Sequence, residues 1–548
     1  MEVIEVRNFE KKCSMEQTNQ KEDRNNIRII STVDSVVKYL IILITCIGAL
    51  FTNSHRFVDS QIMPKWFVAI GGILLLFIYS ICFMFFSNKA VSRKSLIPCA
   101  INVLVITVSF QALYGILQYF NVLSPITKFQ VTGSFDNPAG FVASLVVAFP
   151  FFLLAFIRAK KNIRWGIAYL SVIVVLAVFL SESRTGILSL VIILLCWGLH
   201  YLKFSFKLKG ALVLIVSLGL IGGLYQVKKD SADGRLLIWT CSLEMIKDNW
   251  LTGYGTGGFE AHYMDYQADY FKQHPNSSYA QLADDVQYPF NEYLKFLINY
   301  GLIGFLFILI FIFVLIYCYY RKPSLDKRIA VLSLMAMSIL SFFSYPTLYP
   351  FVWLIALLNI SILLKEFIKT SYPHIIYICF LFLCTICSYQ LYQRIEAELK
   401  WKQFAYRSDE HSLSIYEELE ETLGNDRYFI YNYAVMLYNC NQKELCLQKA
   451  LLCRKLWINY DLELLLGDIY REKKNYKLAE NYYINASCMC PCRFFPLYQL
   501  YELYKETKNG AEVFLTAKKI MEKPAKINSM LVKRIKYKVK KEFEPIVN

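Results

Sequence analysis

Charged residues are scarce in this chain. Asp, Glu, Lys and Arg make up 19% of its 548 residues, whereas hydrophobic residues make up 56% and aromatic residues 16%. The mean hydropathy is +0.36. So little charge beside so much apolar surface excludes an ordinary soluble domain and a disordered chain. The composition is that of a polytopic membrane protein, which has the lipid bilayer as its solvent.

Signals of several other protein classes are missing. The sequence has no basic patch with interleaved aromatic residues, so its net charge of +16 does not indicate a protein that binds nucleic acid. The polar N-terminal segment, residues 1–34, has no cleavage site before the first apolar run, which argues against a cleaved signal peptide. Cys488, Cys490 and Cys492 match no common zinc spacing, so no metal site is predicted, and a redox or disulfide role for them stays open.

Long apolar runs dominate the first 390 residues. Eleven of them are long enough to cross about 30 Å of hydrocarbon as helices. They lie at residues 35–52, 66–86, 97–119, 139–157, 165–181, 184–202, 210–227, 292–320, 328–344, 350–367 and 373–391. We therefore predict an all-α fold, with about eleven membrane-spanning helices followed by a C-terminal helical domain.

Lys and Arg gather in every second loop between these runs. The clusters follow the second, fourth, sixth and eighth runs, and basic loops of this kind are typically cytoplasmic. The pattern predicts a cytoplasmic N-terminal tail (1–34) and a membrane domain (35–392) with a large loop (228–290) on the outer side. It also places the C-terminal domain (393–548) on that outer side.

The C-terminal domain carries a repeat signature. From Leu466 to Pro491, small and aromatic residues follow the tetratricopeptide spacing, and Tyr470 recurs 34 residues later as Tyr504. Two or three degenerate repeats are predicted within residues 400–540. A generic helical bundle is the alternative, because only one unit fits the pattern well. Such repeats bind a protein partner or steady a neighbouring domain, so the chemistry is expected elsewhere.

Three polar segments are predicted to share the outer side. The first, Thr132–Gly140, has an Asn137-Pro138 step that is typical of a capped helix start, and a substrate-binding role is the alternative. The second, Ser181–Gly186, places Arg184 at the end of an apolar run. There its guanidinium group either reaches the membrane interface or grips a phosphate.

The third segment, Asp233–Gly304, is the long polar interruption in the apolar part of the chain. Arg235 is the only arginine of the loop 228–290, which holds more carboxylates than cations. An anion that binds there must therefore be held by one placed arginine. The glycines from Gly253 to Gly258 lack the lysine and the preceding strand of a phosphate loop, so they predict a tight turn rather than a nucleotide site.

Five motifs occur along residues 130–310 in a recognisable order. They are Gly133-Ser-Phe-Asp-Asn-Pro138, Ser183-Arg-Thr-Gly186, the helix start Arg235–Trp239, Leu251-Thr-Gly-Tyr-Gly255 with Phe259, and Asn291-Glu-Tyr-Leu294 followed by Gly301-Leu-Ile-Gly304. Together they resemble the O-antigen ligase and polymerase family of bacterial envelope proteins. The C-terminal repeats are similar to the tail of some members.

The resemblance implies a glycosyltransferase of the bacterial inner membrane that needs no cofactor. It would transfer a glycan from undecaprenyl diphosphate to an acceptor on the periplasmic side, with inversion at the anomeric carbon. Matched positions imply that Arg184 and Arg235 hold the diphosphate, which is the leaving group. No nucleic acid partner is expected.

The general base is less well defined by the resemblance. Ligases of the family often carry a histidine where this chain has Phe290. Glu292, Asn291 and His274 are the candidate catalytic residues, with helix capping as the alternative role for the first two. Two further carboxylates, Asp284 and Asp285, lie earlier in the loop.

The acceptor stays open between a lipid A core, another lipid-linked glycan and a protein hydroxyl. These acceptors correspond to a ligase, a polymerase and a protein O-oligosaccharyltransferase. The missing histidine favours a polymerase over a ligase, and the repeat domain slightly favours a protein partner or acceptor. A non-enzymatic transporter or scaffold is the alternative of another class, but it predicts inverted repeats and charges within the spans, and neither is clear in the sequence.

Overall fold

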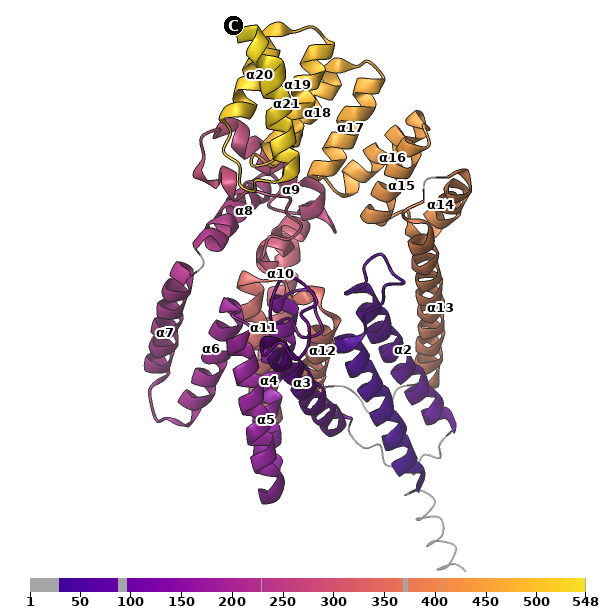
Figure 1. Ribbon diagram of the computed structural model, residues 1–548. Coiled ribbons are helices and arrows are strands. Elements are labelled where there is room, and N and C mark those ends of the chain that lie inside the picture. Colours follow the sequence, from indigo (N-terminus) through magenta and orange to yellow (C-terminus); the bar gives the residue numbers. More distant parts are fainter. Residues whose placement is uncertain (1–28, 87–95, 228, 368–372, 408, 548) are drawn as a thin grey trace, which may run out of the picture. The chain divides into compact units, whose positions relative to one another are not determined.

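The computed structural model describes residues 29–86, 96–227, 229–367, 373–407 and 409–547. All regular secondary structure in these ranges is helical, so the predicted all-α fold is confirmed (Figure 1). Most of the predicted N-terminal tail lies outside the described residues.

The helices form two compact units. The first consists of Met1–Leu202, Leu315–Leu340 and Pro346–Ile395, and the second of Lys203–Val314, Ser341–Tyr345 and Glu396–Asn548.

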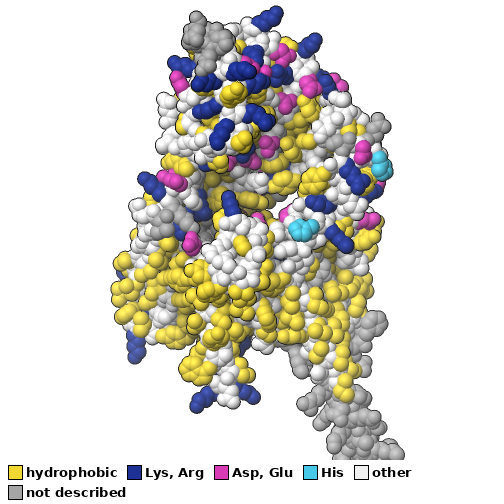
Figure 2. All heavy atoms as spheres, in the orientation of Figure 1, with side chains coloured by type: hydrophobic (Ala, Val, Ile, Leu, Met, Phe, Trp, Pro, Cys, Tyr) yellow, Lys and Arg dark blue, Asp and Glu magenta, His cyan; other side chains and the backbone are white. Residues whose placement is uncertain are grey.

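Nine helices in the described part of the chain are long and apolar enough to cross a membrane. They are Ile29–Phe51, α2 (Met63–Phe86), α3 (Ile97–Tyr119), α4 (Pro138–Arg158), α5 (Lys161–Leu180), α6 (Arg184–Tyr201), α7 (Phe206–Val227), α10 (Glu292–Arg321) and α13 (His374–Phe404). Figure 2 shows hydrophobic side chains spread over the outer faces of such helices, as expected for helices that contact lipid tails. The protein is therefore a multi-pass membrane protein.

The two remaining predicted spans are also helices, but each differs from the nine. The helix α11 (Leu325–Phe343) has a run of three charged residues in its first turn. The helix α12 (Pro350–Leu364) has 15 residues, which rise only about 22 Å and so fall short of the hydrocarbon core. All eleven predicted apolar runs are helical, and nine of these helices meet the length and composition of a span.

The helix α4 forms the centre of the first unit. It has 21 residues, most of them buried, and it contacts α3, α5, α6 and α12. Glycines on two neighbours allow the close approach: a Cβ atom at Gly115 would lie 2.3 Å from the ring of Phe141, and one at Gly186 would lie 2.0 Å from the side chain of Val142. Small residues play this part in other membrane bundles because they let helix backbones come together.

In the second unit, the loop and the C-terminal helices share one hydrophobic core. The loop contains α8 (Lys229–Asp248), α9 (Gly258–Gln273) and the short η1 (Ser278–Gln281). Phe259 and Tyr263 of α9 are buried in the same cluster as Tyr483 and Met489 near the C-terminus. The side-chain amide of Gln267 also donates a hydrogen bond to the carbonyl of Met489 (2.6 Å). The loop therefore folds against helices that lie about two hundred residues further along the chain.

The C-terminal helices form three successive hairpins. These are α15 (Arg427–Asn439) with α16 (Lys443–Leu456), α17 (Tyr460–Glu472) with α18 (Tyr476–Met489), and α19 (Phe495–Glu506) with α20 (Gly510–Glu522); α14 (Glu410–Leu423) precedes them and α21 (Met530–Val547) follows. The turn of each hairpin has one residue with positive φ, namely Asn441, Lys474 and Lys508, so these turns recur every 33 or 34 residues. Gly467 packs against the ring of Tyr483, two positions of the predicted repeat pattern. This regularity supports the tetratricopeptide assignment, which stays a prediction.

Candidate functional site

The first polar segment has a structural role in the first unit. Asn137 caps α4, because its side-chain oxygen accepts hydrogen bonds from the backbone N–H groups of Ala139 (2.9 Å) and Gly140 (3.2 Å). The hydroxyl group of Tyr349 donates to the same oxygen (3.0 Å). The side-chain oxygen of Asn137 is therefore used in holding the helix start, as the predicted Asn137-Pro138 cap requires.

The second polar segment starts α6. Ser183 is the N-cap, and its hydroxyl oxygen accepts from the backbone N–H of Gly186 (3.4 Å). Arg184 is the first residue of the helix and is half-buried within the first unit. Arg235 belongs to the second unit, so a joint role of the two arginines at one diphosphate stays a prediction.

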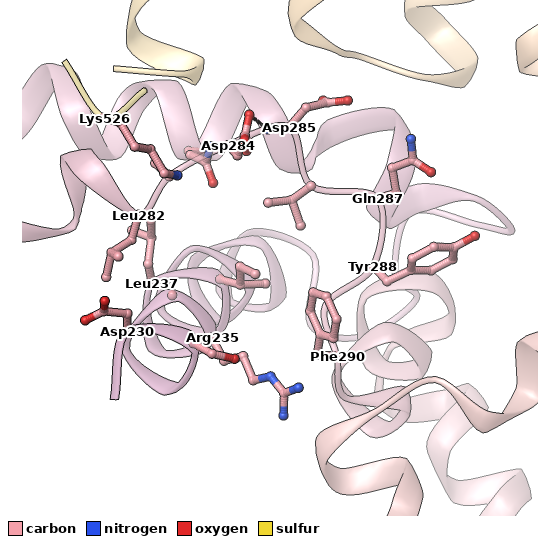
Figure 3. Close-up of a pocket in the computed structure, with 16 residues that line it drawn as sticks. Asp230, Arg235, Leu237, Leu282, Asp284, Asp285, Gln287, Tyr288, Phe290 and Lys526 are labelled. Atoms are coloured by element: carbon pink, nitrogen blue, oxygen red, sulfur yellow. Dashed lines mark hydrogen bonds between the residues drawn. The ribbon is translucent and has the colours of Figure 1, made fainter. Parts of the chain in front are cut away.

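Arg235 lies on α8 at the edge of a pocket in the second unit (Figure 3). The pocket has a volume of about 670 Å³, and its lining comes from α8, α9, the segment 282–290 and Lys526. The guanidinium group of Arg235 donates through Nη1 to the carbonyl of Phe343 (2.8 Å), and its central carbon lies 5.1 Å from the centre of the Phe290 ring. A guanidinium group fixed in this way can bind an oxyanion through parallel hydrogen bonds.

Asp285 is the titratable group that distinguishes this pocket. It is half-buried, and its buried Oδ1 atom has no hydrogen-bond partner among the described residues. Burial raises the pKa of its carboxyl group from 3.8 to about 6. The neighbouring Asp284 is exposed and forms an ion pair with Arg493 (2.7 Å). A pocket carboxylate with a pKa close to neutral is suited to accept a proton during a reaction.

The two ends of the pocket thus differ in chemistry. Figure 3 shows the guanidinium group of Arg235 beside Phe290, with Asp284 and Asp285 on the opposite side of the pocket. A cation at one end can hold a negative leaving group, and a carboxylate at the other end can take a proton. Lys526, on the segment between α20 and α21, lines the pocket close to Asp284.

The three residues predicted to be catalytic do not line this pocket. Asn291 is the N-cap of α10, where its side-chain oxygen accepts from the backbone N–H groups of Tyr293 (3.0 Å) and Leu294 (3.1 Å). Glu292 begins the same helix. His274 ends α9 with an exposed ring that bonds the carbonyl of Tyr270 (3.0 Å). The capping role expected as the alternative for Asn291 is present, and a catalytic role for the three stays a prediction.

The sequence drew attention to Asp285 only as one carboxylate of a loop. The signal that was available is the Asp284-Asp285 pair in a loop that has a single arginine. The two carboxylates differ because Asp285 is half-buried, whereas Asp284 is exposed and paired with Arg493 of the C-terminal region. Those contacts cannot be read from the loop itself.

The glycine cluster forms a turn that packs on α10. Gly253, Gly255 and Gly257 all have positive φ, and the backbone N–H of Gly255 donates to the carbonyl of Asn299 (2.7 Å). Gly301, at a kink in α10, has φ 60° and ψ −165°, a conformation open essentially to glycine alone. The predicted tight turn is present, and it is closed against the start of α10.

The cysteine cluster has no cross-link within the described part of the chain. Cys488, Cys490 and Cys492 are all free thiols. Burial raises the pKa of each of the three, so they stay protonated near neutral pH. Buried protonated thiols of this kind pack as small apolar groups.

Part of the chain matches a known protein family. Residues 169–309 match the family model described as O-antigen ligase. The matched range contains Arg184, Arg235 and Asp285. No curated protein and no solved structure matches the chain.

Proposed function

We propose that this protein transfers a glycan from undecaprenyl diphosphate to an acceptor hydroxyl, because residues 169–309 match the O-antigen ligase family model. The family supports a membrane glycan ligase or polymerase. The observation that carries the finer proposal is the pocket of this domain that has Arg235 at one end and the half-buried Asp285 at the other. The basic loops favour a reaction on the periplasmic side of the inner membrane.

The donor end of the pocket is the end at Arg235. The diphosphate is both the handle by which the donor binds and the leaving group of the reaction. The contacts of Arg235 with Phe343 and Phe290 fix its guanidinium group before the donor arrives. A fixed cation stabilises the charge that grows on the departing diphosphate more than it stabilises the bound donor, and this difference lowers the barrier.

The acceptor end is the end at Asp285. The oxygen of the acceptor hydroxyl forms a bond to the anomeric carbon while the bond from that carbon to the diphosphate oxygen breaks. The diphosphate leaves with the electron pair, and Asp285 takes the proton of the hydroxyl. Attack from the side opposite the leaving group inverts the anomeric carbon. With a pKa of about 6, Asp285 is ionised at neutral pH and still basic enough to help the attack.

The proposal is tested first in cells. A strain that lacks the protein is complemented with the wild type, with Arg235→Ala and with Lys247→Ala. Lys247 is a matched control, because it lies on the same helix and is an exposed cation that pairs with Glu244. The wild type and Lys247→Ala should restore the surface glycan that the strain has lost. With Arg235→Ala, this glycan should stay absent or be shortened to a single unit. Full restoration by Arg235→Ala would refute the donor site.

A further inference from the structure

A second pocket lies in the same unit. It has a volume of about 580 Å³ and is formed by the start of α17, the segment 492–495 and the segment 526–532. Its apolar lining includes Phe495, Ile527 and Leu531. Ile527 is 72% exposed and Leu531 is 52% exposed, so these two side chains leave most of their surface uncovered. Solitary exposed apolar residues are common, but two of them that line one pocket indicate a surface for a ligand.

The second pocket neighbours the pocket at Arg235. Asp284 and Lys526 line both of them. Asp284 directly precedes Asp285, so the second pocket opens beside the end at which the acceptor hydroxyl is activated. A molecule bound in the second pocket would therefore lie close to Asp284, on the same side of the first pocket as Asp285.

We propose that the second pocket binds the saccharide of the acceptor, and that the C-terminal hairpins thereby form part of the substrate site. This proposal rests on the proposed glycan transfer. Saccharides present alternating apolar faces and hydroxyl groups. The lining offers the ring of Phe495 and the side chains of Ile527 and Leu531 to the faces, and Asp461 and Lys526 to the hydroxyl groups.

The lining of the pocket favours a saccharide over a peptide. Two common modes of peptide recognition are the addition of a strand to a sheet edge and the docking of a helix into a long apolar groove. The described residues contain no strand that could offer an edge. The lining of the pocket also combines apolar side chains with the charged side chains of Asp461, Arg493 and Lys526.

Binding of the acceptor can be measured without turnover. The probe is envelope glycan extracted from a strain that lacks the protein, because this glycan carries the unmodified acceptor. It is labelled with a fluorophore and titrated with the full-length protein in detergent, and fluorescence polarisation gives Kd. The test variant combines Ile527→Ser and Leu531→Ser, and both sites are exposed enough for the fold to tolerate serine. Met530→Ser is the matched control, since Met530 is 78% exposed but does not line the pocket.

The wild type and Met530→Ser should bind the glycan with the same Kd. The double variant should bind it about tenfold more weakly, because two apolar contacts are lost. Equal Kd values for the double variant and the wild type, or no binding by the wild type, would overturn the proposal. Arg235→Ala should keep the wild-type Kd for this glycan, so loss of transfer and loss of acceptor binding are separate results.

Discussion

The substitution Asp285→Asn should lower the rate of glycan transfer at least about 100-fold and yet stabilise the protein at neutral pH. Asparagine has nearly the shape of aspartate but cannot take a proton from the acceptor. Loss of a general base lowers a rate by about 100-fold to 10,000-fold. The stabilisation follows from burial, which makes the ionised carboxylate unfavourable in the folded state.

The size and sign of the stabilisation follow from the pKa. The carboxyl group of Asp285 has a pKa of about 6 in the folded protein instead of 3.8. Between these two values the folded state binds the proton more tightly than the unfolded state does, so the free energy of unfolding falls as the pH rises through this window. Above pH 6 the full penalty is on the order of 3 kcal/mol. The amide side chain of the variant does not ionise, so the variant avoids this penalty.

Thermal unfolding of the purified protein in detergent at pH 4 and pH 8 measures this effect. Asp285→Asn should raise Tm by several degrees at pH 8 and by little at pH 4. Asp284→Asn should give no such gain, because the exposed Asp284 is paired with Arg493. Transfer by the wild type should fall below about pH 6 as Asp285 takes up a proton. A variant Asp285→Asn that keeps more than about a tenth of the wild-type rate, or a wild-type rate that is level from pH 5 to pH 7, would refute the assignment.

Three further substitutions test other parts of the account. Arg235→Ala should lower the rate of donor cleavage about 100-fold or more. Arg235→Lys should recover only part of this rate, because an ammonium group cannot bind two phosphate oxygens in one plane. Steady-state kinetics measures the rates of both variants. Gly301→Ala should destabilise the protein by about 3 kcal/mol, because Gly301 has positive φ and the new Cβ atom would lie 2.3 Å from the carbonyl oxygen of Leu251. The control variant Gly222→Ala has open space around the new Cβ atom and should leave Tm unchanged or higher. Glu260→Ala should destabilise the second unit by about 3 kcal/mol, because it leaves the partners Lys295 and Arg427 without their buried carboxylate; limited proteolysis should show faster cleavage of the loop. Burial alone would raise the pKa of Glu260, but Lys295 and Arg427 hold this pKa below its usual range. The stability that the contact provides should therefore be present at neutral pH and be lost in acid, as the carboxylate takes up a proton.

The positions of the membrane helices could be predicted closely from the sequence. An apolar run that is long enough to cross the hydrocarbon core forms a helix along its length, so the run itself marks the helix. Local signals were reliable as well. Asn137 caps α4 as its sequence context predicts, and the glycines from Gly253 form the expected turn. These features depend on residues that are neighbours in the chain.

The candidate site could be predicted only in part. The sequence predicts a role for Arg235 because it is the single arginine of the loop 228–290, and the structure places this residue at the edge of a pocket. The sequence does not show that Asp284 is paired and exposed whereas Asp285 is half-buried with a raised pKa. This difference arises from Arg493 and other residues that lie far along the chain. The same holds for the contact of Gln267 with Met489, which packs the loop on the C-terminal helices. Burial and pairing that come from distant segments leave no pattern in the local sequence.

The most direct test of glycan transfer uses the purified full-length protein, a glycan linked to undecaprenyl diphosphate, and acceptor from a strain that lacks the protein. The account predicts that the wild type releases undecaprenyl diphosphate in step with growth of the acceptor, and that Arg235→Ala and Asp285→Asn each prevent both. Absence of release by the wild type, or release and transfer at the wild-type rate in both variants, would contradict it.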